Sequence, residues 1–138
     1  GSGCIAEDIV VPLGSIAAMV ERTAEIASTS GLYICCYGHS GDGNLHVNIV
    51  YDKERQDQAK HAWDTAAMIF DAAIALQGSI SGEHGIGMIK LGFLARGIDP
   101  VALDVMQRIR RLLDPAGILN PCKALPEPEA GMIPGDAP

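Results

Sequence analysis

Two histidines flank an Asp-Gly pair, and their spacing suits two ligands of one metal ion. His39 and His46 lie on either side of the run SGDGNL. Its Asp-Gly dipeptide, Asp42-Gly43, strongly favours a two-residue β-hairpin turn. With that turn, His39 would face His46 across the two strands, with Cβ atoms about 5 Å apart. Imidazoles at this distance can share a metal ion.

The predicted hairpin separates polar from apolar side chains, because strand side chains alternate between faces. One face carries both histidines, Asn48 and two tyrosines. The other face is apolar and carries Leu32, Ile34, Cys36, Leu45, Val47 and Ile49. We interpret the apolar face as core and the polar face as a site. The pattern alone does not distinguish this site from surface histidines on an ordinary hairpin.

A second cluster adds an acid and a histidine. Residues 81–87 read SGEHGIG and place Glu83 and His84 between glycines, whose backbone can approach a ligand closely. Glu83 would complete a His-His-Glu set that suits zinc, iron or manganese and leaves coordination positions open. His84 would then act as a general base, since imidazole titrates near neutral pH. The segment fits neither a phosphate-binding P-loop nor a dinucleotide-binding fingerprint.

Three segments, in order, resemble the C-terminal region of FAD-linked oxidases. They are GHSGDGNLHVN at 38–48, SGEHGIG at 81–87 and DPAGILNP at 114–121. The run EDIVVP at 7–12 also resembles the beginning of this region. The resemblance extends from about Glu7 to Lys123. It points to the glycolate oxidase, D-lactate dehydrogenase and D-2-hydroxyglutarate dehydrogenase type, within the vanillyl-alcohol oxidase flavoprotein superfamily.

The resemblance assigns roles to the polar residues. In metal-containing members, the positions that match His39, His46 and Glu83 bind a divalent cation. The position of His84 is the proposed base on the substrate. The position of Asn48 contacts the substrate. These assignments agree with the metal site and the base inferred above from residue types.

The last segment departs from the family pattern at one position. The family usually ends it Asn-Pro-Gly-Lys, and here Cys122 replaces the glycine. The resemblance implies that Asn120 and Lys123 contact the flavin cofactor. FAD itself would be bound mainly by an N-terminal domain that this chain does not contain. We therefore expect a C-terminal fragment of a flavoenzyme, and that domain is its predicted partner.

Composition indicates one packed domain. The 138 residues are 48% hydrophobic, and no apolar run approaches the length that spans a membrane. The net charge of −7 argues against a nucleic-acid surface. Because a hydroxy acid is anionic, local cations must offset that charge, and the candidates are the metal ion and Lys90, a predicted substrate contact. The four cysteines lack zinc spacing, so we expect a reduced, cytoplasmic setting.

The pattern of elements predicts an α+β fold of the ferredoxin-like βαββαβ type with an antiparallel sheet, followed by C-terminal helices and a tail. Ser15 would cap the first helix, and Gly31 would end it. Asp99-Pro100 would begin the last helix, and Asp114-Pro115 would stop it. The other expected elements are a strand at 9–11, the hairpin to about residue 52, a helix at about 55–76 and a strand at 78–81.

Four regions follow from these elements. Residues 1–3 read as an expression-tag remnant. Residues 4–98 would form part of the substrate or cap domain, and 99–125 a helix and tail that contact the FAD domain. Residues 126–138, rich in proline and glycine, would be disordered.

The predicted activity belongs to the parent protein. It is the FAD-dependent oxidation of a 2-hydroxy acid such as glycolate or D-lactate to the 2-oxo acid, and the fragment alone would be inactive. We also expect the fragment to self-associate through surface left uncovered. Two alternatives remain open: a stand-alone metal-dependent hydrolase, and a non-catalytic ferredoxin-like interaction domain.

Overall fold

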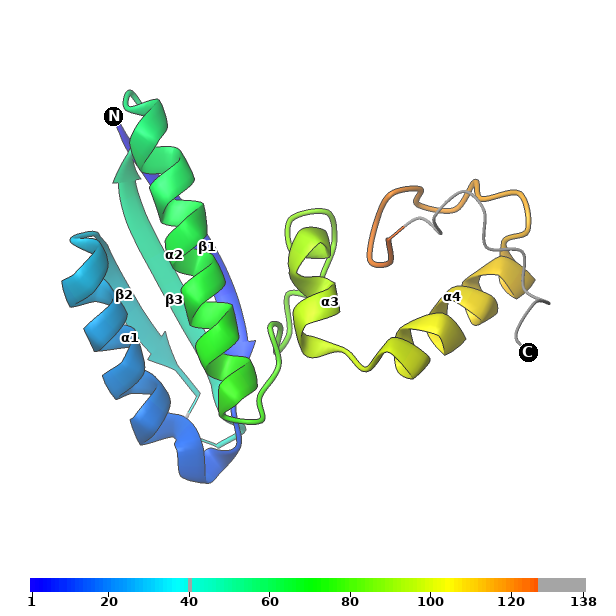
Figure 1. The fold of residues 1–138 in the computed structure, drawn as a ribbon, viewed down its shortest axis with the longest axis horizontal. Helices are drawn as coiled ribbons and strands as arrows, with labels where there is room; N and C mark the ends of the chain where they lie inside the picture. Colours follow the sequence, from blue (N-terminus) through cyan, green and yellow to red (C-terminus); the bar gives the residue numbers. More distant parts are fainter. Residues whose placement is uncertain (40, 127–138) are drawn as a thin grey trace. The chain divides into compact units, whose positions relative to one another are not determined.

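The computed structural model describes residues 1–39 and 41–126, which belong to two compact units (Figure 1). The first unit is Gly1–Gly85, and the second begins at Ile86. The boundary predicted after residue 98 lies inside the second unit. Most of the tail predicted at 126–138 lies outside the described residues.

The first unit contains a three-stranded antiparallel sheet. Its strands are β1 (Ser2–Val10), β2 (Tyr33–Gly38) and β3 (Asn44–Asp52), and β3 lies in the centre. β1 is longer than the predicted strand at 9–11 and pairs with β3 from Ser2 to Val10. The α+β class predicted from the sequence is therefore confirmed.

The strand predicted at 78–81 is reduced to one bridge. Val10 and Ser79 exchange backbone hydrogen bonds of 3.1 and 2.8 Å. Beyond that bridge, the backbone N–H groups of residues 82–84 donate to the Asp8 carboxylate rather than to a neighbouring strand. The fourth strand of the ferredoxin-like order is thus not formed, and that topology is not confirmed.

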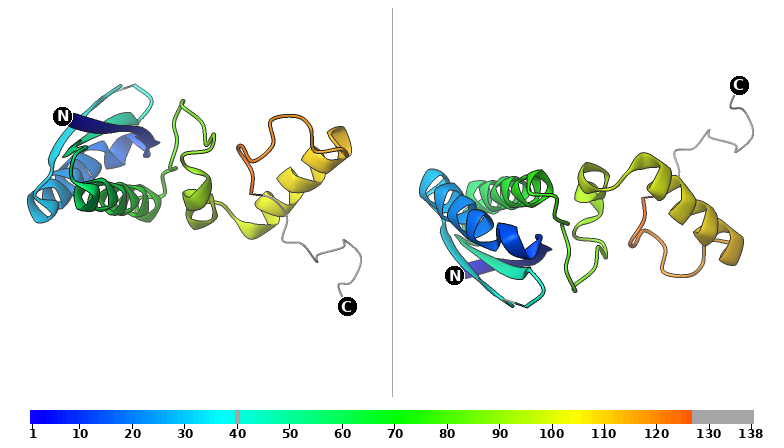
Figure 2. Two further views of the ribbon diagram at one scale, coloured as in Figure 1. Left: turned by 90° about the horizontal axis from the view of Figure 1, so that it is seen from above. Right: turned by 90° about the horizontal axis from the view of Figure 1, so that it is seen from below.

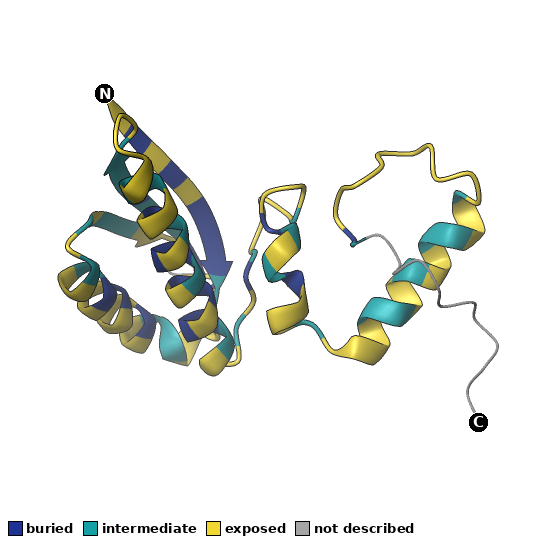
Figure 3. Ribbon diagram, turned by 45° about the horizontal axis from the view of Figure 1, so that its top comes forward, coloured by how far each residue is buried: buried dark blue, intermediate teal, exposed yellow. Residues whose placement is uncertain are grey.

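Two helices pack on one face of the sheet (Figures 1 and 2). A 3₁₀ turn at Leu13–Ser15 leads into α1 (Ile16–Ser30), which ends as predicted at Gly31, where φ is 69°. α2 (Gln56–Ala75) matches the predicted helix to within one residue at each end. Figure 3 shows the buried bands of both helices. The core side chains include Ile5, Ile9, Met19, Ile26, Leu45, Val47, Ile49, Ala66, Ile69 and Phe70.

The second unit contains a 3₁₀ turn (Leu91–Phe93), α3 (Leu94–Gly97) and α4 (Pro100–Leu113). α4 begins as predicted, because the Asp99 side chain accepts from the backbone N–H of Val101 at 2.8 Å. Its apolar stripe is exposed and consists of Val101, Val105, Ile109 and Leu112. Within the described ranges, no helix has the length and apolar character to cross a membrane.

The packing of α2 predicts that substitutions at two neighbouring positions differ in their effect on the free energy of unfolding. Ile69 is 1% exposed, whereas Met68 is 42% exposed. We expect Ile69→Ala to lower the free energy of unfolding by about 2–5 kcal/mol, because it leaves a cavity. Met68→Ala should change it by about 0.5 kcal/mol or less. Urea denaturation of both variants checks this, and equal losses would contradict the assigned packing.

Candidate functional site

The candidate site lies on the sheet face that α1 and α2 leave uncovered. Asp8 on β1 and Tyr37 on β2 each pair with His46 on β3, so the three residues form a row across the sheet. The alternate β3 positions Leu45 and Val47 are buried on the helix side. The predicted separation into a core face and a polar face is therefore confirmed.

The predicted strand register is wrong by two residues. Tyr37, not His39, pairs with His46. The hairpin loop is longer than two residues: the N–H of His39 donates to the carbonyl of Asn44 at 2.9 Å, and Asp42 Oδ1 accepts from the Asn44 N–H at 2.9 Å. A shift by two keeps every side chain on its face, whereas a shift by one would have moved the histidines apart.

A contact with a segment outside the hairpin stabilises the longer loop. The N–H of Val11 donates to the carbonyl of Gly43 at 3.1 Å, which ties the loop to the chain after β1. Gly43 has a φ of 80°, and a Cβ there would collide with the Val11 carbonyl. A glycine is therefore required at this position for both conformation and space.

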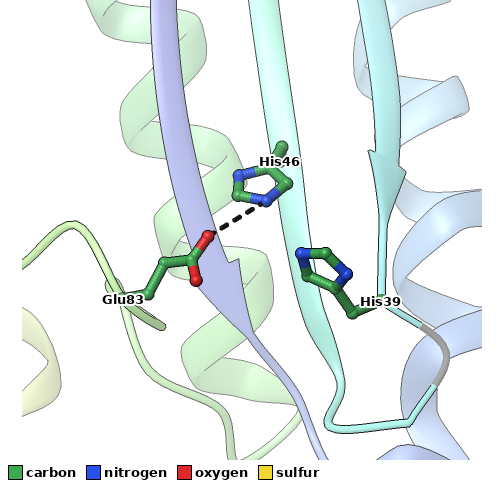
Figure 4. A group of neighbouring side chains, drawn as sticks. All are labelled: His39, His46 and Glu83. Atoms are coloured by element: carbon green, nitrogen blue, oxygen red, sulfur yellow. Dashed lines mark ion pairs between the residues drawn. The ribbon is translucent and has the colours of Figure 1, made fainter.

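His39, His46 and Glu83 converge (Figure 4). They come from the hairpin loop, from β3 and from the segment after Ser81, respectively. One ligand atom of each lies within 4.8 Å of the others. His46 Nε2 is 3.3 Å from Glu83 Oε1, and the two imidazole centroids are 5.6 Å apart.

This donor set fits a divalent metal ion. Two ligands that each lie about 2.0–2.1 Å from one ion are about 3.3 Å apart at tetrahedral geometry. The separation of His46 and Glu83 already matches that spacing. Two imidazoles and one carboxylate are also the ligand types that zinc, iron and manganese accept in open sites.

A buried carboxylate that sequence reasoning missed holds the loop after Ser81. Asp8 is 0% exposed, and its Oδ2 accepts from the N–H groups of Gly82, Glu83 and His84 at 2.8, 2.5 and 3.0 Å. Successive backbone N–H groups of this kind form an anion-binding nest. The sequence offered one clue, two adjacent acidic residues, Glu7 and Asp8, directly before the apolar run IVV.

Gly82 lets the loop lie close against β3. A Cβ at this position would collide with Oδ1 of Asn44, a side chain that is 4% exposed. Among the described residues, that oxygen is buried without a hydrogen-bond partner. The close approach of Gly82 to Asn44 therefore determines how far the next residue, Glu83, lies from the histidines.

His84 and Asn48 lie on the same face as the metal candidates. The His84 ring stacks against His46, with centroids 5.4 Å apart and planes at 29°. The Asn48 amide donates to the Tyr37 hydroxyl at 3.5 Å. The face therefore combines three candidate metal ligands, a further imidazole and hydrogen-bonding groups.

The other predicted site residues belong to the second unit. Lys90 is 2% exposed, so its ammonium is not presented to solvent. Asn120 and Lys123 are exposed, and their carbonyls accept from Arg110 at 3.1 and 2.9 Å. Their roles toward substrate and cofactor remain predictions.

Comparison with known proteins identifies the family. The model of the family described as FAD linked oxidases, C-terminal domain, matches residues 1–124. The chain belongs to this family. Glycolate oxidase subunit GlcD of Bacillus subtilis is 40% identical over 119 residues, which are 86% of this chain and 25% of that protein.

Further relatives of this FAD-linked oxidase domain include a mitochondrial D-lactate dehydrogenase [cytochrome] of Arabidopsis thaliana. It is 32% identical over 91% of the chain and 22% of its own length. The solved 4-ethylphenol oxidase of Gulosibacter chungangensis shares the fold, with a TM-score of 0.65 at 22% identity over 94% of this chain and 25% of its own. The chain thus spans about a quarter of the length of these proteins.

The cluster predicts divalent-metal binding by the FAD-linked oxidase domain. We expect His46→Ala to weaken the binding of zinc or manganese at least about tenfold, because it removes one of three ligands. The matched control is His61→Ala, since His61 lies on α2 and contacts the carbonyl of Ser30. Calorimetric titration measures both variants. Equal affinity in His46→Ala and the unmutated protein would reject the site.

The loop geometry predicts a second effect on metal binding. Gly82→Ala should weaken it, because the new methyl group pushes the loop away from Asn44 and carries Glu83 with it. Gly41→Ala is the control, since a Cβ at Gly41 meets no atom within 4 Å. Titration with the same ions compares them. Unchanged affinity in Gly82→Ala would show that the distance between this loop and Asn44 does not determine metal binding by the cluster.

Proposed function

We propose that this chain is the substrate- and metal-binding part of an FAD-dependent enzyme that oxidises a 2-hydroxy acid to the 2-oxo acid. The observation that carries the proposal is the convergence of His39, His46 and Glu83 beside His84 on one open sheet face. Glycolate and D-lactate, named in the relatives, are both 2-hydroxy acids. They share a carboxylate next to a hydroxyl-bearing carbon.

The three clustered side chains would hold a divalent ion. Such an ion supplies Lewis acidity, which lowers the cost of negative charge on the substrate hydroxyl oxygen. The protein contributes the open face, which would admit the carboxylate and hydroxyl of the substrate beside the three side chains. The ion would also place positive charge where an anionic substrate binds, in a chain whose net charge is −7.

His84 would accept the hydroxyl proton. Its ring lies against His46 and is 46% exposed, so a substrate held at the cluster has access to it. When this proton leaves, the C–O bond gains double-bond character, and the hydrogen on the same carbon departs with its electron pair. FAD, bound mainly by another part of the parent protein, would supply the acceptor for that pair.

Asn48 and Tyr37 would orient the substrate. The Asn48 amide and the Tyr37 hydroxyl are linked at 3.5 Å on the same face as the cluster. Both groups can donate to a carboxylate. The contacts of Lys90 with substrate and of Asn120 and Lys123 with the cofactor belong to the same proposal, as do cytoplasmic localisation and self-association of the isolated chain.

Family membership favours this reading over the two alternatives. A stand-alone hydrolase would use the same ligands but would need no flavin. An interaction domain would not need imidazoles and a carboxylate to converge. The chain belongs to an FAD-linked family and also has the converging ligands.

The proposal predicts the effect of replacing His84 in the full-length protein. We expect His84→Gln to lower kcat about 10²–10⁴-fold, because a general base contributes that much. FAD content should stay unchanged. His61→Gln serves as control and should retain activity. The assay uses glycolate, D-lactate and D-2-hydroxyglutarate with an artificial electron acceptor.

Two results would contradict the proposal. One is full activity of His84→Gln toward every acid that the unmutated protein oxidises. The other is turnover by the protein after complete removal of FAD, which would favour the hydrolase alternative. The isolated chain should show no activity in the same assay, with or without added FAD and divalent metal.

A further inference from the structure

We propose that Asp8 is a positioning residue that sets the tautomer and orientation of His84. This inference rests on the proposed function, in which His84 accepts the substrate proton. Asp8 touches neither substrate nor metal in this scheme. It would act on the reaction only through the imidazole and the loop that carries it.

The Asp8 carboxylate contacts the loop backbone through Oδ2 and the His84 ring through Oδ1. Oδ2 accepts the three backbone N–H groups of residues 82–84. The Ser81 hydroxyl lies 3.3 Å from Oδ1 and 3.5 Å from Oδ2, and Oδ1 lies 3.5 Å from His84 Nδ1. The carboxylate is fully buried, and such a group is costly to bury without donors around it. The loop supplies these donors and brings the imidazole to the second oxygen.

The contact with Asp8 selects one tautomer of His84. A carboxylate has no proton to donate, so it favours the tautomer in which Nδ1 carries the hydrogen. Nε2 is then unprotonated and available to accept a proton. The distance of 3.5 Å is longer than the usual range of about 2.7–3.2 Å for such a hydrogen bond. Catalytic hydrogen bonds are often long without substrate and tighten once substrate is bound.

The contact with Asp8 also orients the ring. Nδ1 and Nε2 lie on different edges of an imidazole. With Nδ1 directed at a carboxylate that is 0% exposed, the Nε2 edge faces away from that buried group. Stacking on His46 restrains the ring plane. His84 is thus held at one edge by Asp8 and along one face by a candidate metal ligand.

Kinetics of three variants of the full-length flavoprotein test this role. Asp8→Asn keeps the shape and one acceptor oxygen, but its amide would donate toward Nδ1 and favour the wrong tautomer. We expect kcat to fall about 10- to 100-fold with little change in KM. In the His84→Gln background, adding Asp8→Asn should cause no further loss. Asp64→Asn, on the exposed surface of α2, is the matched control.

A spectroscopic measurement tests the same contact without relying on activity. Nitrogen-15 NMR of histidine-labelled, unmutated protein should show His84 protonated at Nδ1 and unprotonated at Nε2. Its signals are assigned by their loss in His84→Gln. Asp8→Asn should exchange the two nitrogen environments. Because the first spectrum needs no Asp8 variant, the test stands even if Asp8→Asn does not fold.

The outcomes separate this inference from the proposed function. Protonation at Nε2 in the unmutated protein overturns the inference. So does an Asp8→Asn loss of the same size with and without His84, which would mean that Asp8 only holds the loop. Full activity of His84→Gln instead overturns the proton-acceptor role. In that case the NMR spectrum still decides whether Asp8 sets the tautomer.

Discussion

One buried carboxylate holds the functional loop on the sheet. Asp8 accepts three consecutive backbone N–H groups from residues 82–84, and its burial depends on those donors. The same hydrogen bonds bring Glu83 to the two histidines and His84 to His46. Without this interaction, nothing in the short bridge between Val10 and Ser79 would set the position of the loop.

The sheet assigns core and site to opposite faces. The helix-covered face buries aliphatic side chains, and the free face carries Asp8, Tyr37 and His46, one from each strand. Because β3 is the central strand, hydrogen bonds on both sides restrain His46 and Asn48. A site on a central strand holds its geometry better than one carried wholly by loops. The remaining candidate ligands, His39 and Glu83, come from the hairpin loop and from the loop that Asp8 holds.

Much of the site was predictable because face alternation survives a register error of two. The predicted hairpin paired His39 with His46, yet the shifted hairpin still places both on one side. The helices were also predictable, since Gly31 and Asp99 mark their ends by local chemistry. The loss of the strand expected at 78–81 was not predictable, because the backbone N–H groups of the next residues donate to a side chain distant in sequence. Asp8 was missed for the same reason.

The sequence by itself determined the residue types, the alternation of faces, the helix ends and the family. These depend on short-range spacing and on backbone preferences that each segment carries alone. Only the tertiary structure decided the hairpin register, the loss of the fourth strand and the convergence of His39, His46 and Glu83. The reason is physical: each of these depends on contacts between segments far apart in the chain. The hydrogen bond from Val11 to Gly43 and those from the loop to Asp8 form only once β1, the hairpin and the loop have come together.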